Sequence, residues 1–268
     1  MKVTDIKVGA DPELFLLDIT TNQYKSAEGL IGGTKDEPVV ISKEGFAIQE
    51  DNVMVEFNIP PAKSSTEFVN NNQFMLSYIN SIIPTNLVTV LEPSVEFPWD
   101  ELGTDQAMTF GCSPDENAWT GEQNKSPVAE ATNIRGAGGH LHIGYSNPTI
   151  ETSRRIIQCL DVFLGIPLAC MEPDNARRDF YGKAGACRYK SYGVEYRTPS
   201  NFWLNTPKLM AFVFNQIQVA IEHCNDSDFQ IDFFYDTVVD VINNKETEKG
   251  FTFCEQENLI PVELQKIN

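Results

Sequence analysis

Apolar and polar residues alternate with a period of two in three stretches of the chain, residues 52–59, 134–145 and 192–198. Such alternation predicts β-strands that pack through one face and leave the other face open. The open faces carry Glu56 in the first strand, His140 and His142 in the second, and Glu195 and Arg197 in the third. We therefore expect each of these ionisable side chains to stand on a strand that apolar residues anchor from below.

Residues 6–19 predict a further strand, in which Asp11 and Glu13 share one face because they lie two positions apart. Pro12 separates them and cannot donate to a neighbouring strand, so we expect an edge position or a bulge here. Glu13 precedes four apolar residues, where burying its carboxylate costs on the order of several kcal/mol without a cation or hydrogen bonds. A turn at Asp11 and Pro12 that sends Glu13 to solvent is the alternative.

Apolar residues with a helical period predict helices that cover a face of the sheet. These helices are expected at residues 64–83, 150–171, 207–223 and 229–242. Pro167 should kink or divide the second of them, because proline lacks the backbone N–H that a helix interior requires.

Two stretches lack a regular pattern. Residues 100–127 are irregular, and a loop of this length inside a compact domain is more often functional than accidental, so we expect it to line a substrate entrance. Residues 245–268 are expected to form a peripheral C-terminal segment. Because no internal repeat, low-complexity segment or linker is visible, the sequence favours a single domain over residues 1–268.

Charge and composition limit the classes of protein to which the chain could belong. The 268 residues are 41% hydrophobic, as in an ordinary globular protein, but the net charge is -18 at pH 7. Such a surface repels a phosphate backbone, so we expect no nucleic-acid partner. The six cysteines lack metal-ligand spacing and indicate free thiols in a reducing compartment. With no signal peptide and no run of about 20 apolar residues, a cytoplasmic protein without a membrane partner is expected.

Residues 174–197 carry six basic side chains against three acidic ones. The basic residues are Arg177, Arg178, Lys183, Arg188, Lys190 and Arg197. A solvated loop is the ordinary interpretation of such a cluster. Because the rest of the chain is poor in basic residues, we expect an anionic ligand such as a nucleotide polyphosphate. Gly138 and Gly139, just before the histidines, would let backbone or phosphate groups approach closely.

The four predicted strands together present several hard metal ligands. These are Asp11, Glu13, Glu56, His140, His142 and Glu195. If the strands belong to one sheet, the ligands converge on one face. Carboxylates with a minority of imidazoles suit magnesium or manganese better than zinc. A local salt bridge between Glu195 and Arg197 is the alternative for the last strand.

At these positions the sequence resembles the phage carboxylate-amine ligase type 2 family, within the glutamine synthetase and glutamate-cysteine ligase-like amidoligase superfamily. The resemblance covers roughly residues 8 to 204, and the ordered combination of motifs is specific although each is weak alone. The motifs are Gly9-Ala-Asp-Pro-Glu13, Val53-Met-Val-Glu56, Gly-Gly-His-Leu-His-Ile-Gly at 138–144, Tyr181-Gly-Lys-Ala-Gly-Ala-Cys-Arg188 and Glu195-Tyr-Arg-Thr-Pro-Ser-Asn-Phe-Trp203.

The resemblance implies an α+β, glutamine synthetase-like catalytic domain, in which a curved, mostly antiparallel sheet holds the ligand residues on its concave face and helices on the other. It also implies an ATP-dependent amidoligase: ATP phosphorylates a carboxylate, and an amine then attacks the acyl phosphate to give an amide. The carboxylate-bearing and amine-bearing substrates would be amino acids, peptides or proteins. A phage-encoded chain would act in the host cytoplasm, and its oligomeric state is left open.

The same resemblance implies roles for individual residues. Mg²⁺ or Mn²⁺ would be held by Glu13, Glu56, His140 and Glu195. Catalytic roles fall to Arg197, Arg188 and His142. ATP would be bound by His142, Lys183, Arg188, Arg197 and Arg177. Asp11 is a weaker candidate for metal binding, and orienting another ligand is the alternative role for it.

Two other functions fit the same motifs. A phosphotransferase similar to the guanidino kinases would use the same sheet but leave the phosphate on its product. A non-catalytic nucleotide-binding or structural phage protein would keep the fold without the reaction.

Overall fold

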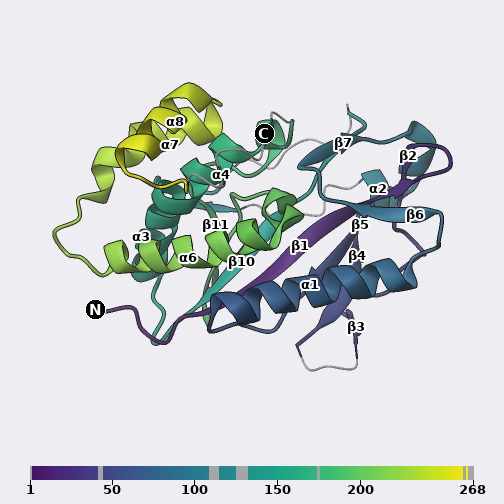
Figure 1. Cartoon of the computed structure of the whole chain (residues 1–268), viewed down its shortest axis with the longest axis horizontal. Helices are drawn as coiled ribbons and strands as arrows, with labels where there is room; N and C mark the ends of the chain where they lie inside the picture. The colour runs from purple at the N-terminus through teal and green to yellow at the C-terminus, as the bar shows by residue number, and fades with distance from the viewer. Residues whose placement is uncertain are drawn as a thin grey trace.

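A ten-stranded sheet forms the centre of the structure, a computed structural model that describes residues 2–41, 45–108, 115–124, 132–173, 176–261 and 264 (Figure 1). The strand order is β3-β4-β5-β1-β10-β12-β11-β8, and β2 and β6 also pair with β1. Every pairing within this sheet is antiparallel. Its strands are β1 (Lys7–Asp18), β2 (Gln23–Lys25), β3 (Val39–Val40), β4 (Ala47–Asp51), β5 (Met54–Asn58), β6 (Leu87–Val90), β8 (Glu116–Asn117), β10 (Gly139–Gly144), β11 (Ala186–Lys190) and β12 (Gly193–Tyr196). A separate two-stranded sheet pairs β7 (Ser94–Glu96) with β9 (Ile134–Gly136).

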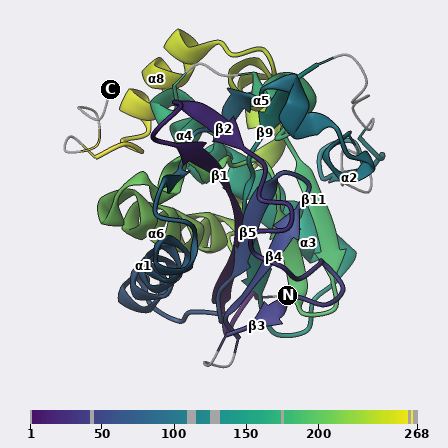
Figure 2. The ribbon, with the colours of Figure 1, turned by 90° about the vertical axis from the view of Figure 1, so that its right-hand side faces the viewer.

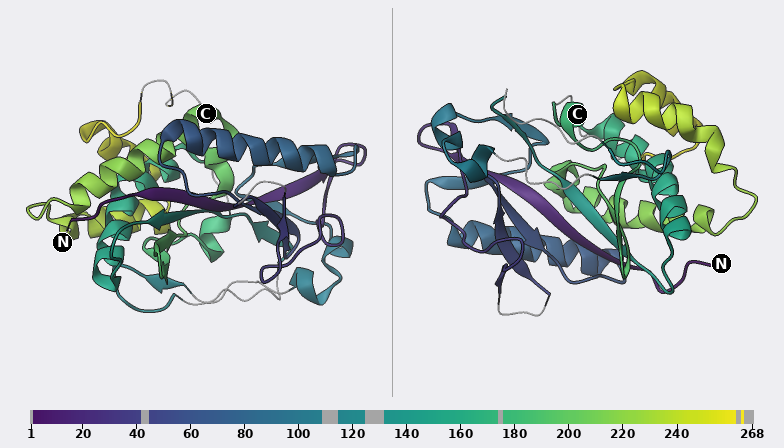
Figure 3. Two further views of the ribbon diagram at one scale, coloured as in Figure 1. Left: turned by 90° about the horizontal axis from the view of Figure 1, so that it is seen from below. Right: turned by 180° about the vertical axis from the view of Figure 1, so that it is seen from behind.

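Helices cover one face of the main sheet. The α-helices are α1 (Ser65–Ile82), α2 (Asp105–Met108), α3 (Ile150–Leu160), α4 (Ile166–Met171), α5 (Arg177–Phe180), α6 (Pro207–Cys224), α7 (Tyr235–Val238) and α8 (Thr247–Gln256). Short 3₁₀ and π segments are η1 (Trp99–Leu102), η3 (Asp161–Gly165), η4 (Asn201–Asn205), η5 (Ile231–Phe234) and η6 (Val239–Asn243). Helices α1 and α6 lie side by side on this face, and α3 packs against α6 and β12 (Figures 1 and 2). Viewed from behind, the strands lie in front of α1 (Figure 3).

The alternation of the strands explains why the long helices α1, α3 and α6 lie on one side. Alternate apolar residues of β1, β5, β10 and β12 point toward these helices and are at most 3% exposed, as in Ala10, Val55, Leu141 and Val194. Aromatic rings complete the contact, because Phe68 of α1 stacks on Trp203 at a centroid distance of 5.5 Å. We call this side the helix-covered face and the other side, which carries the ionisable residues, the open face. The short helix α2 packs on the open face, in a cluster with Phe15 and Met54 (Figure 2).

The predicted α+β class, with a mostly antiparallel sheet and helices on one face, is confirmed. The expected edge position of Pro12 is wrong, because β1 is a central strand. It pairs with β10 through Pro12 and with β5 only from Glu13 onward, so the proline lies next to the start of the β5 ladder. The backbone N–H that proline lacks is therefore not needed for a hydrogen bond to β5 at this position.

The long predicted helix is divided near Pro167, as expected, but the break comes earlier. A π-helical turn, η3, separates α3 from α4, and Pro167 occupies the first turn of α4. This turn absorbs the clash that a proline ring makes with the preceding turn. The C-terminal helix α8 packs against α4. Among the described residues, no helix combines the length and the apolar composition that crossing a membrane would need.

Candidate active site

The strand register brings ligand residues together on the open face. Asp11 of β1 pairs with His140 of β10, and Glu13 of β1 pairs with Glu56 of β5. Partners in an antiparallel pair project to the same side, so their side chains are neighbours across the sheet. Glu195 of β12 pairs in turn with His142 of β10, so the line of ionisable side chains continues across the sheet onto β12. Residues that are more than 180 positions apart in sequence thus meet in one site.

The first cluster consists of Asp11, His140 and Glu195. One ligand atom of each lies within 4.8 Å of the others, close enough for all three to bind one cation. Burial alone would raise the pKa of Glu195, but nearby cationic groups, Arg197 first among them, lower it to about 2. The cluster therefore offers two ionised carboxylates and an imidazole, a donor set that suits a divalent cation.

The second cluster consists of Glu13, Asp51 and Glu56, again with ligand atoms within 4.8 Å of one another. Glu56 is 3% exposed, and its Oε2 atom has no hydrogen-bond partner among the described residues. Burial, and then the charges of Asp11, Asp51 and Glu13, raise the pKa of Glu56 well above its usual value. A bound cation would offset this cost, so the three carboxylates fit a magnesium or manganese ion.

The four expected metal ligands are therefore divided between two clusters, and each cluster contains one further residue. Asp11, the weaker metal candidate, lies directly beside His140 and Glu195. Asp51 was missed altogether. It ends β4 just before a turn at Asn52, whose φ of 59° falls in the left-handed region. The alternation of β4, with Gln49 opposite Glu56, would have placed it on the open face.

Arg197 stands next to the first cluster on the open face. Its guanidinium forms an ion pair with Glu195, lies 2.7 Å from Asp115 Oδ1, and lies 3.3 Å from His140 Nδ1. Arg188 approaches the same two carboxylates at 3.7 and 3.8 Å. The salt bridge that was the alternative for Glu195 and Arg197 thus exists, but within a larger group of charges.

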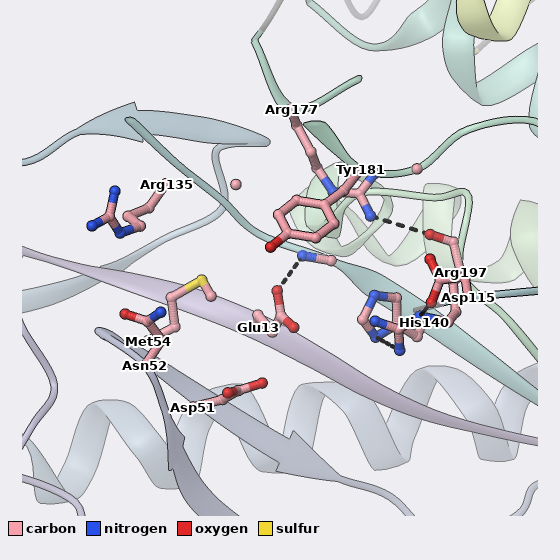
Figure 4. A pocket seen from close by; sticks show the side chains of 13 residues that line it. Glu13, Asp51, Asn52, Met54, Asp115, Arg135, His140, Arg177, Tyr181 and Arg197 are labelled. Atoms are coloured by element: carbon pink, nitrogen blue, oxygen red, sulfur yellow. Dashed lines mark hydrogen bonds and ion pairs between the residues drawn. The ribbon is translucent and has the colours of Figure 1, made fainter. Parts of the chain in front are cut away.

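The segment at residues 115–124 borders this group through Asp115, which lines the pocket between the two clusters (Figure 4). The sequence expected residues 100–127 to line an entrance without naming Asp115. Residues 109–114 and 125–131 lie outside the described part of the chain. Of the rest of this stretch, Asp115 lines the pocket between the clusters, whereas residues within 100–104 line a separate hollow beside Lys25 and Glu28.

His142 is held from both sides. Its Nε2 atom lies 3.0 Å from Asp11 Oδ1, and its Nδ1 atom makes a hydrogen bond with the Tyr192 hydroxyl. Burial would lower the pKa of His142, but the Asp11 carboxylate raises it. A positively charged imidazole beside the first cluster is well suited to contact an anionic ligand.

Two other basic residues expected to contact the nucleotide have different surroundings. Arg177 lines the pocket but donates to the carbonyl oxygens of Thr198 and Arg197 at 2.9 and 3.2 Å. Lys183 is partly buried, which lowers its pKa, and the charges of Asp179, Lys245 and Arg178 also act on it.

The glycines before the histidines make room for protein atoms. A side chain on Gly138 would overlap the His140 ring, and one on Gly139 would overlap the Ser200 carbonyl and the Trp203 indole. Gly138 also donates its N–H to Glu13 Oε2 at 2.5 Å. The backbone at Gly138 therefore holds Glu13 of the second cluster and leaves room for the His140 ring of the first.

Two hollows open on this face. A narrow one, of about 40 Å³, lies between the clusters beside Glu13, Asp51, His140 and Arg197. A wider one, of about 470 Å³, lies on the far side of His142 above Gly9, Gly144 and Tyr192. The first has room for ions or a small reacting group, and the second for a larger ligand.

Comparisons with known proteins found one family model and a solved structure. The model of the family described as "Phage phiEco32-like COOH.NH2 ligase-type 2" matches residues 121–241, which include β10, β11 and β12. The resemblance drawn from the sequence is confirmed over that stretch, and the match suggests a carboxylate-amine ligase. A solved structure titled "Crystal structure of novel glutamine synthase homolog" is similar with a TM-score of 0.37 and 12% identity, over 94% of this chain and 67% of that chain. No curated protein matches the sequence.

Proposed function

We propose that the protein is an ATP-dependent carboxylate-amine ligase that acts through an acyl phosphate, with an amino acid, peptide or protein as substrate. The observation that carries the proposal is the pair of three-residue ligand clusters on one sheet face, with Arg197 beside one of them. Phosphoryl transfer needs charge neutralisation and positioning more than covalent help from the protein, and this face supplies both. Residues 1–268 would form one catalytic unit.

Two divalent ions would be held by the clusters, one by Asp11, His140 and Glu195 and the other by Glu13, Asp51 and Glu56. When bound, such ions neutralise phosphate charge and polarise phosphoryl oxygens. The protein's own contribution is to fix six ligand side chains on paired strands, so that little reorganisation accompanies the reaction.

The nucleotide would occupy the wider hollow, with its phosphates toward His142 and the first cluster. The acceptor carboxylate would then enter from the side of Glu13 and Asp51. A carboxylate oxygen attacks the γ-phosphorus, and the bond to the ADP oxygen breaks. An amine next attacks the acyl carbon, phosphate leaves with the C–O bonding electrons, and the nitrogen loses a proton to give the amide.

Arg197 would neutralise the transferring phosphoryl group and then the departing phosphate. Its counter-ions Glu195 and Asp115 keep the guanidinium at the edge of the first cluster. Arg188, which approaches the same carboxylates, would assist. Arg177 would act by holding the backbone of Arg197 and Thr198, and Lys183 would contact the nucleotide from the loop that precedes β11.

The test is a coupled product analysis. The protein is incubated with ATP, Mg²⁺ or Mn²⁺ and panels of amino acids and peptides, and products are followed by phosphorus NMR and mass spectrometry. A ligase releases ADP and free phosphate in step with a product that is one water lighter than its two precursors. A phosphotransferase would instead leave the phosphate on the product.

Two variants and a control assign the activity to the site. His140→Ala and Glu195→Ala should abolish ADP release, whereas Glu248→Ala, at an exposed position of α8, should leave it unchanged. ADP release that persists in both site variants, or a failure of wild-type protein to bind ATP with either metal in calorimetry, would refute the proposal.

A further inference from the structure

Asp161 is a fully buried carboxylate on the helix-covered face, at the start of the π turn η3. It belongs to neither ligand cluster, yet both of its oxygens are fully engaged by groups from three separate parts of the chain. Oδ1 accepts from the Tyr196 hydroxyl at 2.7 Å and the Thr198 hydroxyl at 3.3 Å, and Oδ2 accepts from Trp119 Nε1 at 2.7 Å and the Gly185 N–H at 2.6 Å.

Two of these donors flank Arg197 in sequence. Tyr196 and Thr198 project to the helix-covered face, so Arg197 between them projects to the open face. The Arg197 N–H donates to the Ala186 carbonyl at 2.9 Å, and Ala186 follows Gly185, another Asp161 partner. The backbone that carries the guanidinium is thus fixed on both of its sides and through its neighbouring strand.

A third donor leads to the counter-ion of Arg197. Trp119 lies four residues after Asp115, in the short segment that borders the site. Helix α3, which ends next to Asp161, also holds this segment, because Arg154 and Gln158 both donate to the Ala118 carbonyl at 3.2 Å. Asp115 in turn lies 2.7 Å from Arg197 Nε.

We propose that Asp161 is a positioning residue of the site: one buried carboxylate holds the strand that carries Arg197 from behind and, through Trp119, holds the Asp115 segment that contacts Arg197 in front. Its link to catalysis rests on the proposed function, but the positioning itself does not. Asparagine cannot replace it, since an amide NH₂ group would face two donors on one side of the carboxylate.

The direct test is an NMR experiment that monitors the Arg197 side chain in the absence of substrate. The Arg197 Nε–H and Trp119 indole N–H signals are recorded by ¹H–¹⁵N NMR, with Arg197→Lys and Trp119→Phe used to assign them. In Asp161→Asn both signals should shift or broaden, whereas the matched change Asp228→Asn, at an exposed position, should leave both in place. Unchanged Arg197 and Trp119 signals in Asp161→Asn would overturn the proposal.

Tyr196→Phe and Trp119→Phe keep the experiment decisive if Asp161→Asn fails to fold. Each removes one donor while leaving the carboxylate. Trp119→Phe should shift the Arg197 Nε–H signal through the loosened Asp115 segment, and Tyr196→Phe should shift it through the strand. An Arg197 signal that neither change moves would show that Asp161 serves the core alone.

Enzyme kinetics distinguish a positioning residue from a residue that only stabilises the fold. A displaced guanidinium should lower kcat by about 100-fold while the KM for ATP changes little. A loss confined to KM, or to the amount of folded enzyme, would contradict positioning. If wild-type protein forms no amide with any substrate, the proposed function fails, but the NMR result still decides whether Asp161 positions Arg197.

Discussion

The substitution Glu56→Gln should stabilise the metal-free protein, although it alters a side chain that is 3% exposed. Glu56 shares its cluster with Glu13 and Asp51, with ligand atoms within 4.8 Å of one another. Two unit charges at that separation repel by roughly 3.5 kcal/mol at an effective dielectric constant of about 20. Glu56 escapes part of this cost by taking up a proton, because burial and the neighbouring carboxylates raise its pKa.

We expect a gain of about 1–2 kcal/mol in the free energy of unfolding at pH 7, a part of that repulsion, because a neutral amide carries no charge toward Glu13 and Asp51. Glutamine is nearly isosteric and keeps the packing. The assay is denaturant unfolding in the presence of EDTA, with Glu248→Gln on the exposed surface of α8 as the matched control. That control should change stability by less than about 0.5 kcal/mol.

Bound Mn²⁺ should reverse the order of stability of wild type and Glu56→Gln. Mn²⁺ at one hundred times its dissociation constant stabilises a single-site protein by about 2.7 kcal/mol, and wild-type protein should show at least this shift. Glu56→Gln should show a smaller one because the second cluster has lost a charged ligand. The reasoning is refuted if Glu56→Gln is less stable than wild type in EDTA and still gains as much from Mn²⁺.

Three further predictions concern neighbouring residues. Gly138→Ala should displace the His140 ring, costing about 1–3 kcal/mol in unfolding free energy and weakening Mn²⁺ binding in calorimetry. Arg197→Lys should lower kcat for ADP release by about 100-fold, because an ammonium cannot reproduce the guanidinium contacts to Glu195 and Asp115. Burial raises the pKa of Asp161 from 3.8 to about 6, so the folded state binds this proton more tightly, and the stability that results is present below pH 4 and is lost as pH rises through 6. The stability difference between wild type and Asp161→Asn should therefore change by about 2.5 kcal/mol between pH 4 and pH 7 in denaturant titrations, and a flat difference would contradict this assignment.

The strands that carry the site could be predicted because their alternation is local. Glu56, His140 and Glu195 each stand between apolar neighbours that pack on the helix-covered face. This pattern alone placed their side chains on the open face. The resemblance to amidoligases then suggested magnesium or manganese for the same positions.

The division into two clusters could not be predicted, because it depends on strand register. Nothing in the sequence pairs Asp11 with His140 rather than with His142. Asp51 escaped notice because it lies at a hairpin turn, where a backbone with positive φ at Asn52 interrupts the pattern. Register and turn geometry depend on contacts between distant segments.

Loop residues show the same limit. Lys183 belongs to a basic stretch but follows Gly182, whose φ of 65° turns the chain, and its side chain lies among Asp179, Arg178 and Lys245. Charge composition predicted an anionic partner for the whole stretch without indicating which side chains face it. Asp115 likewise came from an irregular segment that has no periodicity to orient it.

Anomalous diffraction from crystals grown with Mn²⁺ and a non-hydrolysable ATP analogue would show whether this sheet face holds two divalent ions beside a nucleotide. Two manganese peaks are predicted, one among Asp11, His140 and Glu195 and the other among Glu13, Asp51 and Glu56, with the analogue's phosphates next to His142 and Arg197. Crystals that bind the analogue without manganese at either cluster would contradict the account.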